Sequence, residues 1–145
     1  MVVDMQQDFN AANGKSVVSN CKKVIKQAML DDASIIFLEY NGCGPTKYEL
    51  FNLTDGYANT YVDIKDEDDG SLEVAVLIRK HKLNKNHIKV CGVNTDCCVA
   101  STVRGLTSRF LNANIEILAS ACASDWNHPS GLSALRKMPN VNVRV

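Results

Sequence analysis

Short apolar runs typical of β-strands alternate with helical runs along the chain, and this alternation is the strongest constraint on its fold. Apolar residues recur at helical spacing from Val17 to Met29 and would form one buried face. We expect strands near residues 1–3, 34–38, 61–64, 88–93, 115–118 and 141–145, and helices near 17–29, 71–78, 99–110 and 129–138. Such alternation predicts a mainly parallel sheet covered on both faces, a three-layer α/β/α fold of about six strands.

Length and composition exclude several classes of protein. The 145 residues suit a single domain, 1–145, with 46% hydrophobic residues, 22% charged residues and a formal net charge of +0. We see no basic stripe, no apolar run of membrane length and no signal peptide, so we expect neither nucleic acid nor a membrane as partner. The six cysteines form no Cys-x-x-Cys motif and no zinc-like cluster, which favours reduced thiols and a cytoplasmic location.

Three ionisable side chains are expected at the carboxyl edge of the sheet, where ligands of such folds bind. Asp4 follows the first strand, Lys65 follows the third, and Cys98 lies just past the fourth, at the start of a helix. Free N–H groups and the helix dipole favour a thiolate there, which makes Cys98 a candidate nucleophile. The competing interpretation is that Cys98 is a small core residue, as most buried cysteines are.

Two segments resemble the motifs of a known family. Residues 2–9, Val-Val-Asp-Met-Gln-Gln-Asp-Phe, look like the opening motif of the isochorismatase-like cysteine hydrolases, which include nicotinamidases and N-carbamoylsarcosine amidases. Residues 92–99, Gly-Val-Asn-Thr-Asp-Cys-Cys-Val, followed by Thr102, are similar to that family's nucleophile motif. The resemblance covers nearly the whole chain and implies an isochorismatase-like, Rossmann-like fold.

The resemblance also implies a reaction. A triad of Asp4, Lys65 and Cys98 would cleave a C–N bond of a small amide or carbamoyl substrate through a thioester on Cys98. Backbone N–H groups of Asn94 and Cys98 would hold the oxyanion, and the Val93–Asn94 peptide bond would be cis. We expect no cofactor, a small-molecule substrate as partner and a possible homo-oligomer.

The lysine of this triad departs from the family pattern. Residues 66–71 stand where Ser-Ala-Phe often follows the family's lysine, and residues 66–69 are expected to be a solvated acidic turn that caps the next helix. Lys80 and Lys82 are competing cations, but they lie at the far end of that helix. The stretch 41–59 is expected to be a long loop that serves the site.

Other features bear on the substrate. Nicotinamidases carry an Asp-x-His and a further histidine that bind a metal, whereas residues 37–46 contain no histidine; the three histidines are scattered, at His81, His87 and His128. We therefore expect no metal in catalysis. Candidate pocket residues are Phe9, Tyr40 and Trp126.

Three alternatives to a metal-free amidohydrolase stay open. They are a catalytically silent binding or scaffold protein on the same fold, a nicotinamidase or isochorismatase-type activity, and a thiol redox protein that uses Cys97 and Cys98. If Cys98 is an activated thiol, iodoacetamide should modify it faster than the other cysteines.

Overall fold

The computed structural model describes residues 1–145 as a parallel sheet between two layers of helices. Its strands are β1 (Val2–Val3), β2 (Ile35–Tyr40), β3 (Thr60–Lys65), β4 (His87–Gly92), β5 (Asn114–Cys122) and β6 (Val141–Arg144). They lie in the order β3-β2-β1-β4-β5-β6, and every neighbouring pair is parallel. The predicted α/β fold class, with a sheet of six strands, is confirmed.

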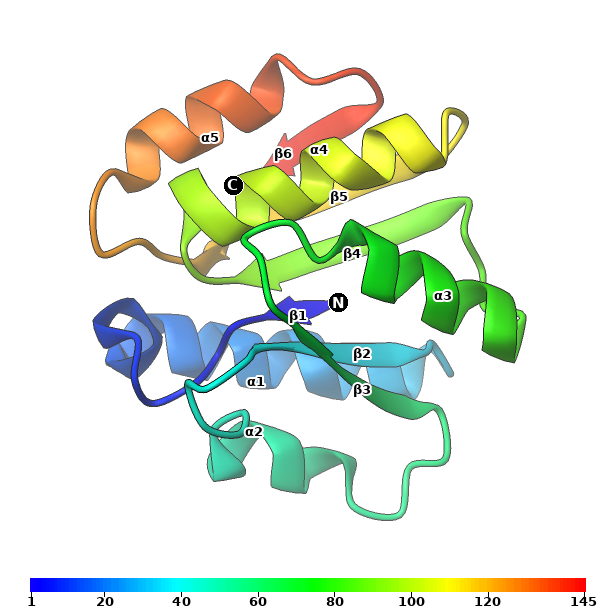
Figure 1. The fold of residues 1–145 in the computed structure, drawn as a ribbon. Helices are drawn as coiled ribbons and strands as arrows, with labels where there is room; N and C mark the ends of the chain where they lie inside the picture. Colours follow the sequence, from blue (N-terminus) through cyan, green and yellow to red (C-terminus); the bar gives the residue numbers. More distant parts are fainter.

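Helices cover both faces of this sheet. They are α1 (Lys15–Leu30), α2 (Tyr48–Phe51), α3 (Ser71–His81), α4 (Ala100–Arg109) and α5 (His128–Arg136). In Figure 1, α1 lies behind the sheet, whereas α3 and α4 lie in front of it and α5 lies beside α4. The apolar face predicted for the first helix is buried in α1, through Val17, Val18, Cys21 and Ile25. None of these helices has the length and apolarity that a membrane crossing requires.

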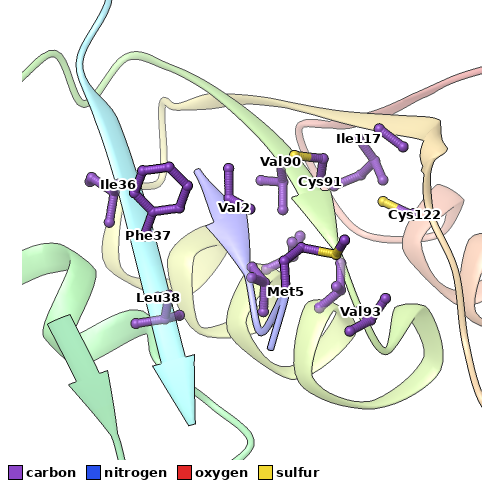
Figure 2. Packing of buried hydrophobic residues seen from close by; sticks show 14 of the residues in the cluster. Val2, Met5, Ile36, Phe37, Leu38, Val90, Cys91, Val93, Ile117 and Cys122 are labelled. Carbon is purple, nitrogen blue, oxygen red and sulfur yellow. The ribbon is translucent and has the colours of Figure 1, made fainter. Parts of the chain in front are cut away.

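The core is densest around the short central strand β1. Val3, Phe37, Val90 and Ile117 have no exposed surface, and Figure 2 shows their neighbours meeting across β2, β1, β4 and β5. Full burial of one such side chain stabilises the fold by roughly 1.5–3 kcal/mol. The carboxyl ends of β1 and β4 are therefore held by the best-packed part of the molecule.

A glycine lets those two strand ends approach each other. Gly92 has φ +122°, and a Cβ there would lie 2.0 Å from the carbonyl oxygen of Val3. Any side chain would therefore force β4 away from β1. The close approach brings the segment after Gly92 beside the residue that follows β1, which is Asp4.

The structure differs from the sequence prediction in two places that matter for the site. Residues 41–59 do not form one long loop, because they contain α2 and a 3-10 turn at Asn52–Thr54. Leu50 is fully buried and the Phe51 ring lies 5.4 Å from the Phe37 ring, so this stretch packs on the core. The helix after β4 begins with a π-helical turn, Thr95–Val99, before α4. Such turns are common at functional sites.

Candidate active site

A buried ion pair lies at the carboxyl edge of the sheet. The Lys65 Nζ is 3.0 Å from Asp4 Oδ2, and the two side chains are 0% and 1% exposed. Lys65 ends β3 and Asp4 follows β1, so their meeting spans the intervening strand β2. The lysine that the sequence places in the site is therefore in contact with Asp4, whereas Lys80 and Lys82 are exposed near the end of α3.

The surroundings of Lys65 offset the cost of burying its charge. Its ammonium donates a hydrogen bond to the Glu67 carbonyl oxygen at 3.0 Å and lies 4.1 Å from the centre of the Tyr40 ring. A cation over an aromatic face is stabilised when it is desolvated. Gly70 makes room for the side chain, because a Cβ there would lie 2.7 Å from Lys65 Cδ. The ammonium is thus fixed in one orientation toward Asp4.

Asp4 lies between this ammonium and the Cys98 thiol. Its backbone has φ +48°, in the left-handed region, and its N–H donates to the Leu38 carbonyl at 2.9 Å. Burial raises the pKa of Asp4, while the Lys65 charge and a hydrogen bond with the Cys98 thiol lower it. Neither carboxylate oxygen has a well-formed hydrogen bond in the chain. The carboxylate is therefore available to accept a proton from its neighbour.

The Cys98 thiol is buried, and its surroundings raise its pKa. Its side chain lies in the π-helical turn, and the residue is 3% exposed. Burial raises the pKa of Cys98, and the negative charge of Asp4 raises it further. Desolvation and the Asp4 charge therefore oppose the preference for a thiolate that the helix start predicts. The faster alkylation of Cys98 stays a prediction, and Cys43 and Cys97 are the more accessible thiols with which it would compete.

The segment after β4 contains a free backbone donor at Asn94. The Val93–Asn94 peptide bond is cis, as the resemblance implies. The Asn94 carbonyl accepts from the N–H groups of Cys97 and Val99, and its Oδ1 accepts from the Asp125 N–H at 2.8 Å. The Asn94 N–H itself donates to no acceptor in the chain. A buried free donor beside a thiol is suited to hold a developing oxyanion.

Sequence reasoning missed Asp68. Its carboxylate accepts from the Cys97 thiol at 3.3 Å and from the Cys98 thiol at 3.7 Å. The expected capping turn holds for Asp69, whose Oδ1 accepts from the Ser71 N–H at 2.7 Å, but Asp68 instead faces the thiols. The only available signal was that acidic residues replace the usual Ser-Ala-Phe beside Lys65.

Thr102 holds the loop that carries Asp68. Its hydroxyl accepts from the Gly70 N–H at 3.0 Å and donates to the Asp68 carbonyl at 3.2 Å, and it is fully buried. We expect Thr102→Val to lower the free energy of unfolding by about 1–3 kcal/mol, because a buried N–H is left unpaired. Denaturant melts of Thr102→Val and Thr102→Ser test this, and equal losses in both variants would contradict it.

The histidine-free segment 37–46, which the sequence resemblance places at the expected metal position of nicotinamidases, has its carboxylate Glu39 engaged within the chain. Glu39 Oε1 accepts from the N–H and hydroxyl of Thr46, at 2.7 and 2.9 Å, so its donor oxygen is engaged. The histidines lie elsewhere: Nδ1 of His128 is 2.8 Å from the Thr95 hydroxyl, His87 is near Glu116, and the His81 ring lies against Tyr61. His128 is half-buried.

The candidate pocket residues are not all at the same place. The rings of Phe9 and Tyr40 lie 6.4 Å apart, edge to face, and Tyr40 lies against Lys65. Trp126 is 70% exposed, and its backbone N–H donates to the Ser124 hydroxyl. Tyr40 therefore borders the ion pair with Phe9 beside it, and the pocket role of all three aromatic residues stays a prediction.

Comparison with models of protein families identifies the family of this chain. The model of the isochorismatase domain matches residues 1–139. The chain belongs to the isochorismatase family. The family resemblance read from residues 2–9 and 92–99 is confirmed. Comparison with curated protein sequences finds no match.

Solved structures of isochorismatase-family members share the fold. The nicotinamidase SaPncA from Staphylococcus aureus is 23% identical, with a TM-score of 0.82 over 99% of this chain and 94% of that one. N-carbamoylsarcosine amidase from Thermoplasma acidophilum is 16% identical, with a TM-score of 0.81 over 99% and 92%. MAR1 ribonuclease from Caenorhabditis elegans is 19% identical, with a TM-score of 0.81 over 98% and 73%. These likenesses show that the chain shares the fold of the three proteins.

Proposed function

We propose that this isochorismatase-family protein is a cysteine amidohydrolase that cleaves a C–N bond of a small amide or carbamoyl compound. The observation that carries the proposal is the buried Lys65–Asp4 pair, with 3.0 Å between Nζ and Oδ2, placed against the Cys98 thiol. A base beside a thiol, oriented by a third group, is the usual arrangement for an activated nucleophile. The low exposure of all three side chains favours a small substrate.

In the first half of the reaction, Asp4 accepts the thiol proton as the Cys98 sulfur attacks the carbonyl carbon. The carbonyl π electrons move to oxygen, and the N–H groups of Asn94 and Cys98 bind the resulting oxyanion. When the tetrahedral intermediate collapses, the C–N bond breaks and Asp4 gives its proton to the departing nitrogen. Lys65 holds Asp4 in place and stabilises its ionised form before attack.

In the second half, water hydrolyses the thioester. Asp4 takes a proton from the water, whose oxygen attacks the acyl carbon. The C–S bond then breaks, and the Cys98 sulfur regains its proton from Asp4. This cycle needs no metal to polarise the carbonyl, because the backbone donors bind the oxyanion.

The rate should depend on the ionisation of Asp4. Asp4 must be a carboxylate to act as base, and burial raises its pKa. Activity should therefore be present above the pKa of Asp4 and be lost as pH falls through it. We expect the acid limb of kcat/KM above about 3.9, the usual aspartate value. A limb at or below that value would contradict Asp4 as the buried base.

A panel of small primary amides and carbamoyl compounds tests the proposal directly, with ammonia release or loss of substrate as the readout. At least one compound should be turned over, and Asp4→Asn should lose that turnover while keeping the fold. A panel on which the wild type is inert would favour a silent binding protein.

Prolonged chelation should leave turnover intact. Glu39 is engaged by Thr46 and has no histidine beside it, which disfavours the metal-assisted nicotinamidase alternative. The measurement compares rates before and after dialysis against a strong chelator. A loss of rate that added zinc restores would contradict the metal-free reaction.

A further inference from the structure

Three metal-ligating groups converge beside the proposed nucleophile. The carboxylate of Asp68 and the thiols of Cys97 and Cys98 place their ligand atoms within 4.8 Å of one another. Asp68 Oδ2 is 3.3 Å from the Cys97 sulfur, and Asp68 Oδ1 is 3.7 Å from the Cys98 sulfur. The hydrolysis proposed above uses Cys98 but has no role for Cys97 or Asp68.

The spacing fits a single tetrahedral ion. With Zn–S bonds of about 2.3 Å and a Zn–O bond of about 2.0–2.2 Å, a sulfur and an oxygen on one zinc ion lie about 3.6 Å apart. The two S···O distances observed, 3.3 and 3.7 Å, bracket this value. Soft thiolate ligands select zinc and similar thiophilic cations over magnesium or calcium. Small side-chain rotations would therefore suffice to form the site.

The ligands are held in place before any ion binds. Cys97 and Cys98 lie in the same π-helical turn, Thr95–Val99. The loop of Asp68 is fixed by the Thr102 hydroxyl, through the Asp68 carbonyl and the Gly70 N–H. A site whose ligands are already positioned loses less entropy on binding.

The charges around the cluster favour a cation. The negative charge of Asp4 is balanced by Lys65, but Asp68 forms no salt bridge, so its charge has no counterpart. Asp4 is 1% exposed, its Oδ2 is 3.0 Å from Lys65 Nζ, and it lies close to the same Cys98 sulfur. The other oxygen of Asp4, Oδ1, is buried without a hydrogen-bond partner, and a cation at the Cys98 sulfur would satisfy it.

We propose that Asp68, Cys97 and Cys98 form a binding site for a thiophilic divalent cation such as Zn²⁺, and that the bound cation blocks the Cys98 nucleophile. On binding, each thiol loses its proton to the buffer and forms an S–metal bond, and Asp68 supplies an oxygen ligand. Water or Asp4 completes the coordination. The sulfur electron pair that would attack a carbonyl is then engaged. The binding stands on the geometry alone, whereas the inhibition rests on the proposed hydrolase function.

Titration of the metal-free protein with Zn²⁺, in competition with a chromophoric chelator, tests the binding. The wild type should bind a single equivalent, and both Cys97→Ser and Asp68→Asn should weaken the affinity by about tenfold or more. Cys43→Ser is the matched control, since Cys43 is also a partly accessible thiol but lies outside the cluster. Equal affinity in Cys97→Ser and the wild type would overturn the proposal.

Cd²⁺ supplies a readout that does not depend on activity. Its charge-transfer absorption reports thiolate ligands, and it should appear in the wild type and Cys43→Ser and be reduced in Cys97→Ser. Absorption that is unchanged in Cys97→Ser would overturn the site. Circular dichroism and a thermal melt of each variant without metal distinguish lost binding from lost folding.

Inhibition is measured separately, with any amide that the protein turns over. Zn²⁺ should stop turnover by the wild type, whereas Cys97→Ser should keep its metal-free rate and need about tenfold more Zn²⁺ for the same inhibition. If Zn²⁺ binds through Cys97 yet no amide is turned over, the proposed function fails and the metal site stands. If turnover persists with the site filled, the blocking role fails.

Discussion

Cys98→Ala should abolish hydrolysis, with a loss in kcat of about 10⁴-fold or more, because the C–S bond of the intermediate can no longer form. Cys97→Ala is the matched control: it removes the neighbouring thiol of the same π-helical turn and should retain turnover. The measurement is initial rate with an amide that the wild type hydrolyses, on variants whose thermal melts match the wild type. Near-wild-type turnover by Cys98→Ala would show that Cys98 is not the nucleophile.

Lys65→Met should lower the free energy of unfolding by about 3–5 kcal/mol, because it leaves the Asp4 carboxylate buried without its cation. Lys65 and Asp4 are 0% and 1% exposed, so water cannot replace the lost partner without opening the core. Lys80→Met, which removes an exposed lysine near the end of α3, is the control and should change stability by less than about 0.5 kcal/mol.

A double variant tests whether the stability loss of Lys65→Met comes from the unpaired charge of Asp4. Asp4→Asn keeps the shape of the side chain and tolerates the left-handed backbone at φ +48°. Lys65→Met combined with Asp4→Asn should therefore be more stable than Lys65→Met alone. Denaturant melts of the four proteins form the cycle. Purely additive losses would show that Lys65 acts through packing alone.

The loss in free energy of unfolding caused by Lys65→Met, here called the deficit, should also depend on pH. Burial raises the folded-state pKa of Asp4, and removing Lys65 removes a charge that opposes this rise. A carboxyl whose folded pKa is raised stabilises the fold below its unfolded pKa, and this contribution is lost as pH rises through the folded pKa. The deficit should therefore grow from acid toward neutral pH. A deficit that is constant over this range would argue against an ionised Asp4.

The fold was predictable because its signal is repeated along the chain. Several strands contain apolar runs, and their alternation with helices constrains the sheet to be parallel. The ends of the strands and helices were harder to predict. β5 extends to Cys122, well beyond the apolar run, because its last residue pairs with Gly92 through a shift in register. The short helix α2 was missed because four residues leave no periodicity to detect.

The site was predictable only where it coincides with a motif or a strand end. Asp4, Lys65 and Cys98 each follow a strand, and parallel strands end at one edge of the sheet. Asp68 was not found because its approach to Cys98 joins residues 30 apart in the sequence and depends on the Thr102 hydrogen bonds. The raised pKa of Cys98 could not be predicted, because the sequence indicates a helix start but not the depth of burial that opposes ionisation.

The central claim is that Cys98 forms a covalent acyl intermediate. Its most direct test is mass spectrometry of protein quenched by acid during turnover of a small amide, followed by peptide mapping. The account predicts that the acyl mass appears on the peptide that contains Cys98, is absent in Cys98→Ala and persists in Cys97→Ala. Turnover without any adduct, or an adduct on Cys97 in its place, would contradict it.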